Sequence, residues 1–342
     1  MNRQKRIVQT KAGKRETKDI KYFADYQLRW DTLISQLKNY QLVHVDFLSI
    51  PGDAPKDFIR DSEHRPGHRT RKQRVERYIA KVGSKFYPNE SITEQLLTRI
   101  GQLFGLTIAD SKLRLIDEQV RFLSRYFLDR HNEQLIHGAQ IFEQSLGKDE
   151  YAQLADGKKE SEYFTFQMVC EAIRASFSEF EIRLVKGLVE MLAFDCLIGH
   201  NDRHPYNWGV IVPIYKVQSP RFSPVFDTAR ALFWNVPETR VKQMLSDRRQ
   251  LETYIAKCSP PFSWDKEPDV DFFRLIGLIW EHFDKYKPHI EMFLDETAFC
   301  NTLQMVDKEF GDLMSSERRQ LIQECLRLRH QKLVEAIKAQ GK

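Results

Sequence analysis

The chain has 342 residues, of which 42% are hydrophobic and 12% aromatic. This composition is ample for a packed core and excludes disorder of the whole chain, and the length suggests two domains or one two-lobed unit. The net charge is +5, and residues 1–21 alone hold eight Lys or Arg against two Asp or Glu. We expect a basic flexible tail over residues 1–21 on a nearly neutral body, which argues against a dedicated nucleic-acid-binding fold.

The five cysteines are odd in number, lie far apart and never form a C-x-x-C pair. A disulfide framework and a zinc ribbon are therefore disfavoured. No stretch reaches the roughly 18 apolar residues of a membrane-spanning helix, and the charged amino terminus lacks the apolar core of a secretory signal. We expect a cytoplasmic protein without a membrane span, although an exported effector would carry the same residues.

The first part of the chain, residues 22–127, predicts a small strand-rich lobe. A helical run at 26–37 and a β-like piece at 42–48 precede an exposed loop at 51–72, which holds three prolines and two glycines. The segment YIAKV at 78–82 then reads as a short strand with one lysine in an otherwise apolar run.

A helix is predicted from the apolar spacing at 96–104. Thr93 can cap its amino terminus, Glu94 lies in the predicted first turn, and Gly105 stands where a carboxyl-terminal cap belongs. Two more strands, KLRLI and VRFLS, should complete the lobe.

Residues 128–342 predict a larger, mainly helical lobe. Its helical pattern is interrupted once, where a loop runs into a strand within 200–212 and a second strand-like run follows at 221–226. The aromatic-rich segment at 272–283 predicts a buried helix. The whole is an α+β architecture with a small β-rich lobe and a large helical lobe that contains one β-hairpin.

Three oxygen-bearing side chains near this hairpin can do chemistry. Asp202 and Asn207 are five residues apart on a loop, and Asp227 lies twenty residues beyond Asn207. The hairpin would bring Asn207 and Asp227 to the same end. Their oxygens suit Mg²⁺, which takes its remaining ligands from water and substrate phosphates. Asp202 would then accept a proton from an incoming hydroxyl.

Phosphoryl transfer also uses a lysine that is held by a glutamate. Lys81 lies in the YIAKV strand, and Glu94 follows 13 residues later in the predicted helix. An ion pair between them would hold the ammonium over nucleotide phosphates. The alternatives are a lysine that snorkels at a sheet edge and a glutamate that serves only the helix amino terminus.

Three motifs occur in order along the chain: T-E-x(10)-G-L at 93–106, GHNDRHPYNWGV at 199–210 and SPVFDTARALFW at 223–234. Together they resemble the HipA-type serine/threonine kinases over roughly residues 60–290, especially stand-alone members with D-R-H-x-x-N and N-W-G. The D-R-H-x-x-N string is also similar to the catalytic loop of phosphatidylinositol 3- and 4-kinases. The resemblance implies a two-lobed protein-kinase-like fold that uses ATP and Mg²⁺ to phosphorylate a Ser or Thr of a protein substrate.

The resemblance also implies roles for single residues. Asp202 would be the catalytic base, and Asn207 and Asp227 would bind Mg²⁺. Lys81 would contact the nucleotide phosphates, and Glu94 would position Lys81.

Further roles follow from the resemblance alone. His204 would brace the catalytic loop, and Arg125 to Phe127 would form the hinge that receives adenine through backbone groups. The phosphate-covering loop should be 61–72, although Gly67 stands alone where the family has a glycine-rich run. Autophosphorylation in this loop has two candidate sites, Ser62 and Thr70.

Alternatives remain at this point. His200 and His204 have a spacing that suits zinc on a helix, although Pro205 argues for a loop. Asp202 and Arg203 could form only a surface salt bridge. A lipid kinase, a nucleotide-binding pseudokinase or scaffold, and a nucleic-acid-binding regulator are the alternative functions, the last without a helix-turn-helix or RNA-recognition pattern. We expect any regulatory partner to be a separate chain.

Overall fold

The structure, a computed structural model, describes only part of the chain. The described residues are 3–9, 15–21, 33–37, 43–44, 56–61, 76–81, 83, 86–149, 151, 164–215 and 218–339. Ser62, Thr70 and nearly all of the predicted phosphate-covering loop lie outside the described residues. The same holds for most of the helix predicted at 26–37.

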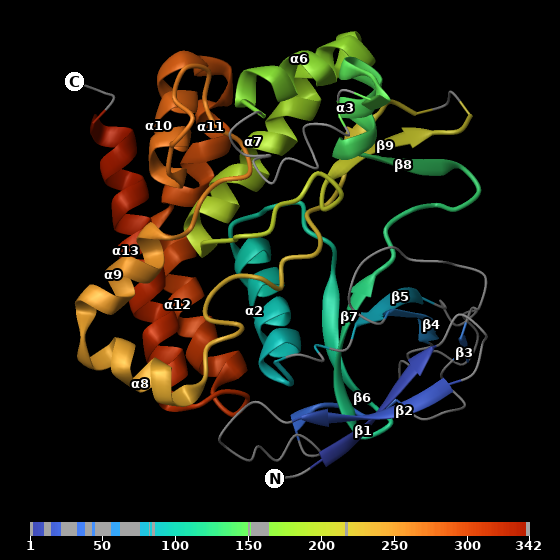
Figure 1. The fold of residues 1–342 in the computed structure, drawn as a ribbon, viewed down its shortest axis with the longest axis vertical. Coiled ribbons are helices and arrows are strands. Elements are labelled where there is room, and N and C mark those ends of the chain that lie inside the picture. Colours follow the sequence, from blue (N-terminus) through green and yellow to red (C-terminus); the bar gives the residue numbers. More distant parts are fainter. Residues whose placement is uncertain are drawn as a thin grey trace.

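A five-stranded antiparallel sheet forms the small lobe, with the strand order β3-β4-β5-β7-β6 (Figure 1). Strand β5 lies inside the sheet between β4 and β7, with Lys81 opposite Lys56 and Phe122. The sheet-edge alternative for Lys81 is therefore wrong. The strands are β3 (Val43–His44), β4 (Lys56–Asp61), β5 (Glu76–Lys81), β6 (Ser111–Ile116) and β7 (Gln119–Arg125).

The segment predicted as a flexible tail contains two strands, β1 (Arg3–Gln9) and β2 (Arg15–Lys21), which pair antiparallel. Ile7 lies opposite Thr17 in their register. Charge alone suggested a tail, but short runs with β-branched residues on both sides of a connection also permit a hairpin.

Helix α2 (Asn89–Leu103) lies against the small-lobe sheet and also contacts a helix of the large lobe (Figure 1). It begins four residues before the predicted cap, so Thr93 is a buried residue inside the helix. Gly105 follows the helix with φ +74°, in the left-handed region that a glycine adopts at little cost. One apolar face of α2 joins the core of the large lobe through Ile92, Leu96, Leu97 and Ile100, together with Phe104 directly after the helix.

The large lobe packs helices around α7 (Glu181–Ile198), whose residues 191–198 are all buried. The segment predicted as a buried helix is α10 (Phe272–His282), with Phe272, Leu275 and Ile276 in the core. The other helices are α3 (Gly138–Leu146), α6 (Phe166–Phe177), α8 (Glu238–Ser246), α9 (Arg248–Ala256), α11 (Lys287–Glu291), α12 (Glu296–Phe310) and α13 (Ser316–Ala339), with short 3-10 turns at Ser178–Phe180, Asp284–Tyr286 and Met292–Leu294.

The predicted hairpin in the large lobe is present as β9 (Gly209–Pro213) and β10 (Arg221–Phe222). A third strand that the sequence did not predict, β8 (Glu133–His137), pairs with β9. It was missed because five residues without clear alternation carry little strand signal. Beyond β10 the chain no longer pairs with β9. Val225 forms a β-bridge with Ile108, in the segment between α2 and β6, and this bridge brings Asp227 toward Lys81.

None of the described helices is both long and apolar enough to cross a membrane. All five cysteines lie in the described part of the chain and are unpaired, as predicted.

Candidate active site

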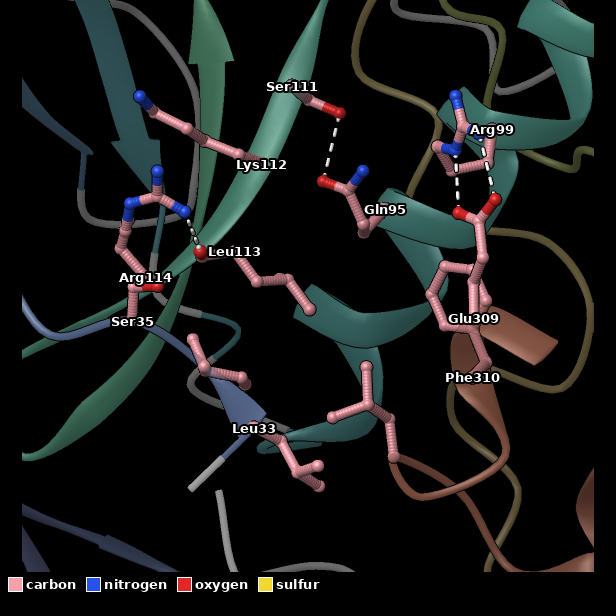
Figure 2. A pocket seen from close by; sticks show the side chains of 12 residues that line it. Leu33, Ser35, Gln95, Arg99, Ser111, Lys112, Leu113, Arg114, Glu309 and Phe310 are labelled. Carbon is pink, nitrogen blue, oxygen red and sulfur yellow. Dashed lines mark hydrogen bonds and ion pairs between the residues drawn. The ribbon is translucent and has the colours of Figure 1, made fainter. Parts of the chain in front are cut away.

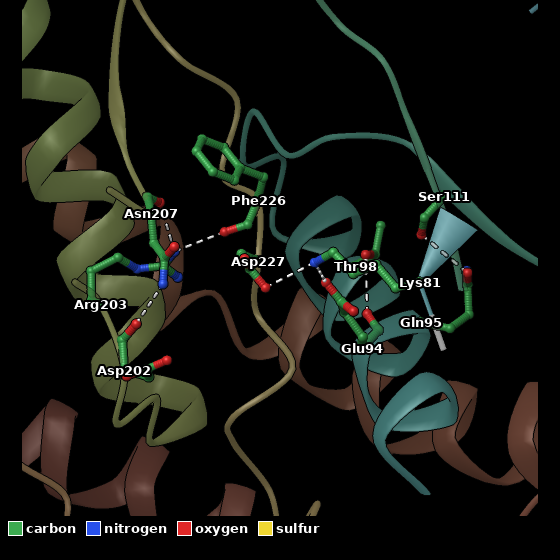
Figure 3. A network of polar contacts seen from close by, with 10 residues as sticks. All are labelled: Lys81, Glu94, Gln95, Thr98, Ser111, Asp202, Arg203, Asn207, Phe226 and Asp227. Carbon is green, nitrogen blue, oxygen red and sulfur yellow. Dashed lines mark hydrogen bonds and ion pairs between the residues drawn. The ribbon is translucent and has the colours of Figure 1, made fainter. Parts of the chain in front are cut away.

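Lys81, Glu94 and Asp227 meet at the junction of the two lobes. The Nζ atom of Lys81 lies 2.6 Å from Oε1 of Glu94 and 2.8 Å from Oδ1 of Asp227. Figure 3 shows the ammonium between the two carboxylates, one from α2 and one from the loop after β10. Lys81 and Asp227, which are 146 positions apart in sequence, are thus in direct contact.

Burial shapes the electrostatics of this cluster. The side chains of Lys81 and Glu94 are only 11% and 3% exposed. Burial by itself lowers the pKa of Lys81, but the attraction of Asp227 and Glu94 together outweighs it and raises the pKa above its ordinary value. The lysine therefore stays charged across the physiological range. A glutamate that is buried and paired in this way does more than serve the helix amino terminus.

Asp227 adopts an uncommon backbone conformation, with φ +56°. A non-glycine residue rarely occupies the left-handed region, and Asp and Asn tolerate it best. Such strain persists where surrounding contacts hold the chain, and it concentrates at functional sites.

The loop from Gly199 to Asn207 places the other predicted residues. Nδ2 of Asn207 donates to the carbonyl of Asp202 at 2.9 Å, and its backbone N–H donates to the carbonyl of His204 at 2.7 Å. The amide orientation leaves Oδ1 of Asn207 without a partner among the described residues. The turn therefore fixes Asn207 with its oxygen available as a ligand.

A buried ion pair that the sequence did not predict holds this loop from beneath. Arg203 donates from Nε and Nη2 to the two carboxylate oxygens of Asp195, each at 2.8 Å, and both side chains are fully buried. Its Nη1 also donates to the carbonyls of Asn207 and Phe226, at 3.2 and 2.9 Å (Figure 3). One guanidinium thus ties α7, the loop and the chain before Asp227 together.

We predict that Arg203→Met destabilises the fold by about 3–5 kcal/mol, because it leaves the Asp195 carboxylate buried without a partner. Urea denaturation would measure this change. Arg174→Met is the matched control, since Arg174 pairs with Glu181 on the surface and its loss should change stability little. Equal stability of the two variants would contradict a bracing role for Arg203.

Asp202 is 37% exposed at its side chain and pairs through Oδ2 with Nη1 of Arg230 at 3.1 Å. The predicted alternative, a surface salt bridge between Asp202 and Arg203, is wrong because Arg203 is committed to Asp195. Burial, followed by the repulsion of Asp227, raises the pKa of Asp202, while Arg230 opposes the shift.

The two histidines of the loop differ in position. His204 is exposed; its ring stacks on Tyr206 with centroids 5.3 Å apart, and its Nδ1 accepts a hydrogen bond from the backbone N–H of Tyr206 at 3.3 Å. Arg203 supports the loop from the interior, and the bracing role of His204 stays a prediction. His200 is buried, and burial and the nearby Arg203 lower its pKa to about 4. The residues around them are not helical, which removes the geometry that the zinc alternative required.

Glu90 is a further acid of this region that sequence reasoning missed. It lies one helical turn before Glu94, and burial, followed by the repulsion of Glu94, raises its pKa to about 7. The cations Lys81 and Arg230 act in the opposite direction. Its signal in the sequence was the spacing of four residues to Glu94, which places both on one helix face.

We predict that the contribution of Glu90 to stability falls between about pH 4.5 and pH 7, because the folded chain keeps a proton on Glu90 that the unfolded chain loses. Glu90→Gln carries no charge at any pH. It should match the wild type near pH 4.5 and exceed it at pH 8 by on the order of 1 kcal/mol. Thermal melts at both pH values test this, with the exposed Glu335→Gln as control. A difference in Tm between Glu90→Gln and wild type that is equal at both pH values would contradict it.

The residues predicted as the hinge follow β7. Arg125 lies at its end and pairs with Glu76, with Nη2 and Oε1 3.2 Å apart. Phe127 is half-buried, and its ring lies 5.7 Å from that of Phe226, which precedes Asp227. The backbone N–H of Tyr126 donates to the carbonyl of Arg77 at 2.8 Å. The backbone of Phe127 makes no hydrogen bond to the backbone of another described residue.

The oxygen donors of this site suit a divalent cation that also binds phosphate. Within the described ranges, no cluster of three Asp, Glu, His or Cys could hold a metal alone. Three carboxylates, Glu94, Asp202 and Asp227, however, face two cations, Lys81 and Arg230, and the partly protonated Glu90 lies beside them. This excess of negative charge, with one amide oxygen beside it, fits a Mg²⁺ that takes its other ligands from phosphates.

A separate pocket of about 330 Å³ lies beside α2, lined by Gln95 and Arg99 of that helix, by β6 and by the end of α12 (Figure 2). At its rim Arg99 of α2 pairs with Glu309 of α12 through two bonds of 2.8 Å. Gln95 of α2 accepts a hydrogen bond from Ser111 at 3.0 Å (Figure 2). These contacts fasten α2 to both lobes and so set the position of Glu94.

Comparison with known proteins gives the family. The family described as the HipA-like C-terminal domain matches residues 48–306, well over half of the chain. The chain belongs to this family. The resemblance inferred from the motifs is thereby confirmed. No curated protein matches the chain.

Two solved structures show the same fold. The proinflammatory kinase CtkA of Helicobacter pylori superposes with a TM-score of 0.66 at 15% identity, covering 90% of this chain and 98% of that one. The HipA, HipB and operator DNA complex of a Shewanella oneidensis MR-1 toxin–antitoxin system matches with a TM-score of 0.50 at 12% identity, covering 85% of this chain and 66% of that one. The predicted fold, an α+β protein-kinase-like HipA fold, is confirmed.

Proposed function

We propose that the chain is an ATP- and Mg²⁺-dependent protein kinase that phosphorylates Ser or Thr. The observation that carries the proposal is the contact of one buried lysine with carboxylates from both lobes, at 2.6 and 2.8 Å. Kinases use this lysine and its glutamate to hold the nucleotide phosphates. The family match and the fold support the same reaction class.

Each residue of the site has a separate proposed role. Lys81, fixed by Glu94, would bind the phosphates, and the hinge around Phe127 would receive adenine through its backbone. Asn207 and Asp227 would hold Mg²⁺, which neutralises charge on the phosphates when bound. Asp202 would orient the acceptor hydroxyl.

In the proposed reaction the acceptor oxygen forms a bond to the γ-phosphorus while the bond from that phosphorus to the bridging oxygen of ADP breaks. The hydroxyl proton passes to the carboxylate of Asp202. The products are a phosphate ester and ADP. The half-exposed position of Asp202 leaves room for a hydroxyl to approach.

The acceptor class is tested with γ-labelled ATP, Mg²⁺ and two acceptors, a generic basic protein and phosphoinositide vesicles. We expect label on protein and none on lipid. Label on lipid alone would favour the lipid kinase that D-R-H-x-x-N suggests. A nucleotide that raises Tm without any transfer would favour a pseudokinase.

Autophosphorylation at Ser62 or Thr70 remains part of the proposal. Intact-mass measurement after incubation with Mg²⁺ and ATP should show the gain of one phosphate, and its loss in Ser62→Ala or Thr70→Ala would assign the site. We also propose that any regulatory partner is a separate chain; the Shewanella structure contains HipB as such a chain.

A further inference from the structure

We propose that Arg230 is a catalytic residue whose guanidinium leaves Asp202 and binds the transferring phosphoryl group. This inference rests on the proposed function and adds a residue to it. Arg230 lies three residues beyond Asp227. In the structure its Nη1 is 3.1 Å from the carboxylate that would receive the hydroxyl proton.

The backbone around Arg230 is held firmly. Its carbonyl accepts a hydrogen bond from the N–H of Asn201 at 3.2 Å, which joins it to the loop of Asp202. Leu232 and Phe233 have φ +45° and +64°, in the left-handed region that is costly for non-glycine residues. Arg318 stabilises this turn, donating to the carbonyls of Phe233 and Val236 at 2.8 and 2.5 Å.

The side chain, by contrast, is free to exchange partners. Asp202 and Arg230 are 37% and 41% exposed, and an exposed ion pair of this kind contributes little to stability. The guanidinium carbon lies 5.7 Å from the ring centroid of Trp234, which supports the group by a cation–π contact. Trp234 is only half-buried and touches Phe86, ahead of α2, with ring centroids 4.9 Å apart.

The charges of the site favour a phosphoryl group as the second partner. A base covered by a cation is hindered from accepting a proton, so Arg230 must pair with another anion when Asp202 acts. Arg203 cannot serve, because it is fully buried against Asp195. A guanidinium stays charged and matches phosphate oxygens with two parallel donors.

The acceptor oxygen must lie within hydrogen-bond distance of Asp202 and in line with the γ-phosphorus. Because the guanidinium of Arg230 lies 3.1 Å from Asp202, a phosphoryl group presented to that base would come close to it. The equatorial phosphoryl oxygens gain charge in the transition state, and donors placed there accelerate transfer more than they strengthen binding. Arg230 should thus affect kcat and not nucleotide affinity.

The test compares wild type with Arg230→Ala and Arg230→Lys by two measurements, label transfer from γ-labelled ATP to a generic basic protein and calorimetric affinity for Mg²⁺ with a non-hydrolysable ATP analogue. We expect Arg230→Ala to lower kcat by about 10²–10³-fold. Its KM for ATP and its analogue affinity should stay within about threefold, and Arg230→Lys should recover part of the rate, outcomes that a merely structural role would not give. The exposed Arg249→Ala is the control.

An unchanged rate in Arg230→Ala would overturn the inference, and so would a faster one, which would mark Arg230 as a residue that blocks the base. Arg230→Gln, which keeps the stem over Trp234, replaces the alanine variant if that variant does not fold. If the wild type neither binds the analogue nor transfers label, the proposed function fails and this inference with it. If the wild type does both and Arg230→Ala matches it, only the inference fails.

Discussion

Asp202→Asn should abolish phosphoryl transfer, with a loss of about 10³-fold or more, while the fold and nucleotide affinity persist. The amide has the shape of the carboxylate but cannot accept the hydroxyl proton. The variant also loses the charge that faces Arg230, but that half-exposed pair contributes less than about 1 kcal/mol. Label transfer, a thermal melt and calorimetry with the non-hydrolysable analogue measure the three properties.

The matched control is Asp265→Asn, an exposed carboxylate of the same lobe. It should transfer at the wild-type rate. Transfer by Asp202→Asn at the wild-type rate would remove the residue from the base position. A large drop in its Tm would instead mean that the carboxylate serves stability.

Asp227→Asn should weaken the binding of the Mg²⁺–nucleotide complex by about 10–100-fold or more, since a neutral amide replaces a charged metal ligand. The substitution suits the backbone, because Asn tolerates the φ of +56° as well as Asp does. It also removes one of the two carboxylates that contact Lys81, which frees the ammonium for phosphate.

Calorimetry with and without Mg²⁺ separates these effects. Without metal, the variant should bind the nucleotide at least as well as the wild type. With metal, it should gain far less affinity than the wild type gains. Equal gains would place the metal elsewhere.

Local sequence signals were sufficient for Lys81 and Glu94. A lone lysine in an apolar strand, followed by a carboxylate on the next helix, indicates which strand and which helix carry the pair and which face of each element the two side chains share. Asp227 followed from the sequence only in part: the hairpin was predicted, but β10 ends at Phe222, and the chain reaches Lys81 because Val225 then bridges Ile108. The predicted helix start at Thr93 was wrong because the apolar spacing marks the packed face and not the first turn.

Tertiary partners were the part that the sequence could not supply. Arg203 looked like an exposed loop residue, whereas it is buried against Asp195, eight residues earlier. A signal for it existed: an aspartate inside the apolar run 191–198 must find a cation if that helix is buried. Arg230 had no such signal, because its contact with Asp202 depends on the strained turn that follows it.

The central claim is that one Mg²⁺–nucleotide complex joins the two lobes at these residues. A crystal structure with Mn²⁺ and a non-hydrolysable ATP analogue tests it most directly, because the anomalous signal of the metal locates it. The account predicts the metal on Asn207 and Asp227, with Lys81 on the phosphates and the γ-phosphoryl group facing Asp202. A metal or nucleotide bound away from these four residues would contradict it.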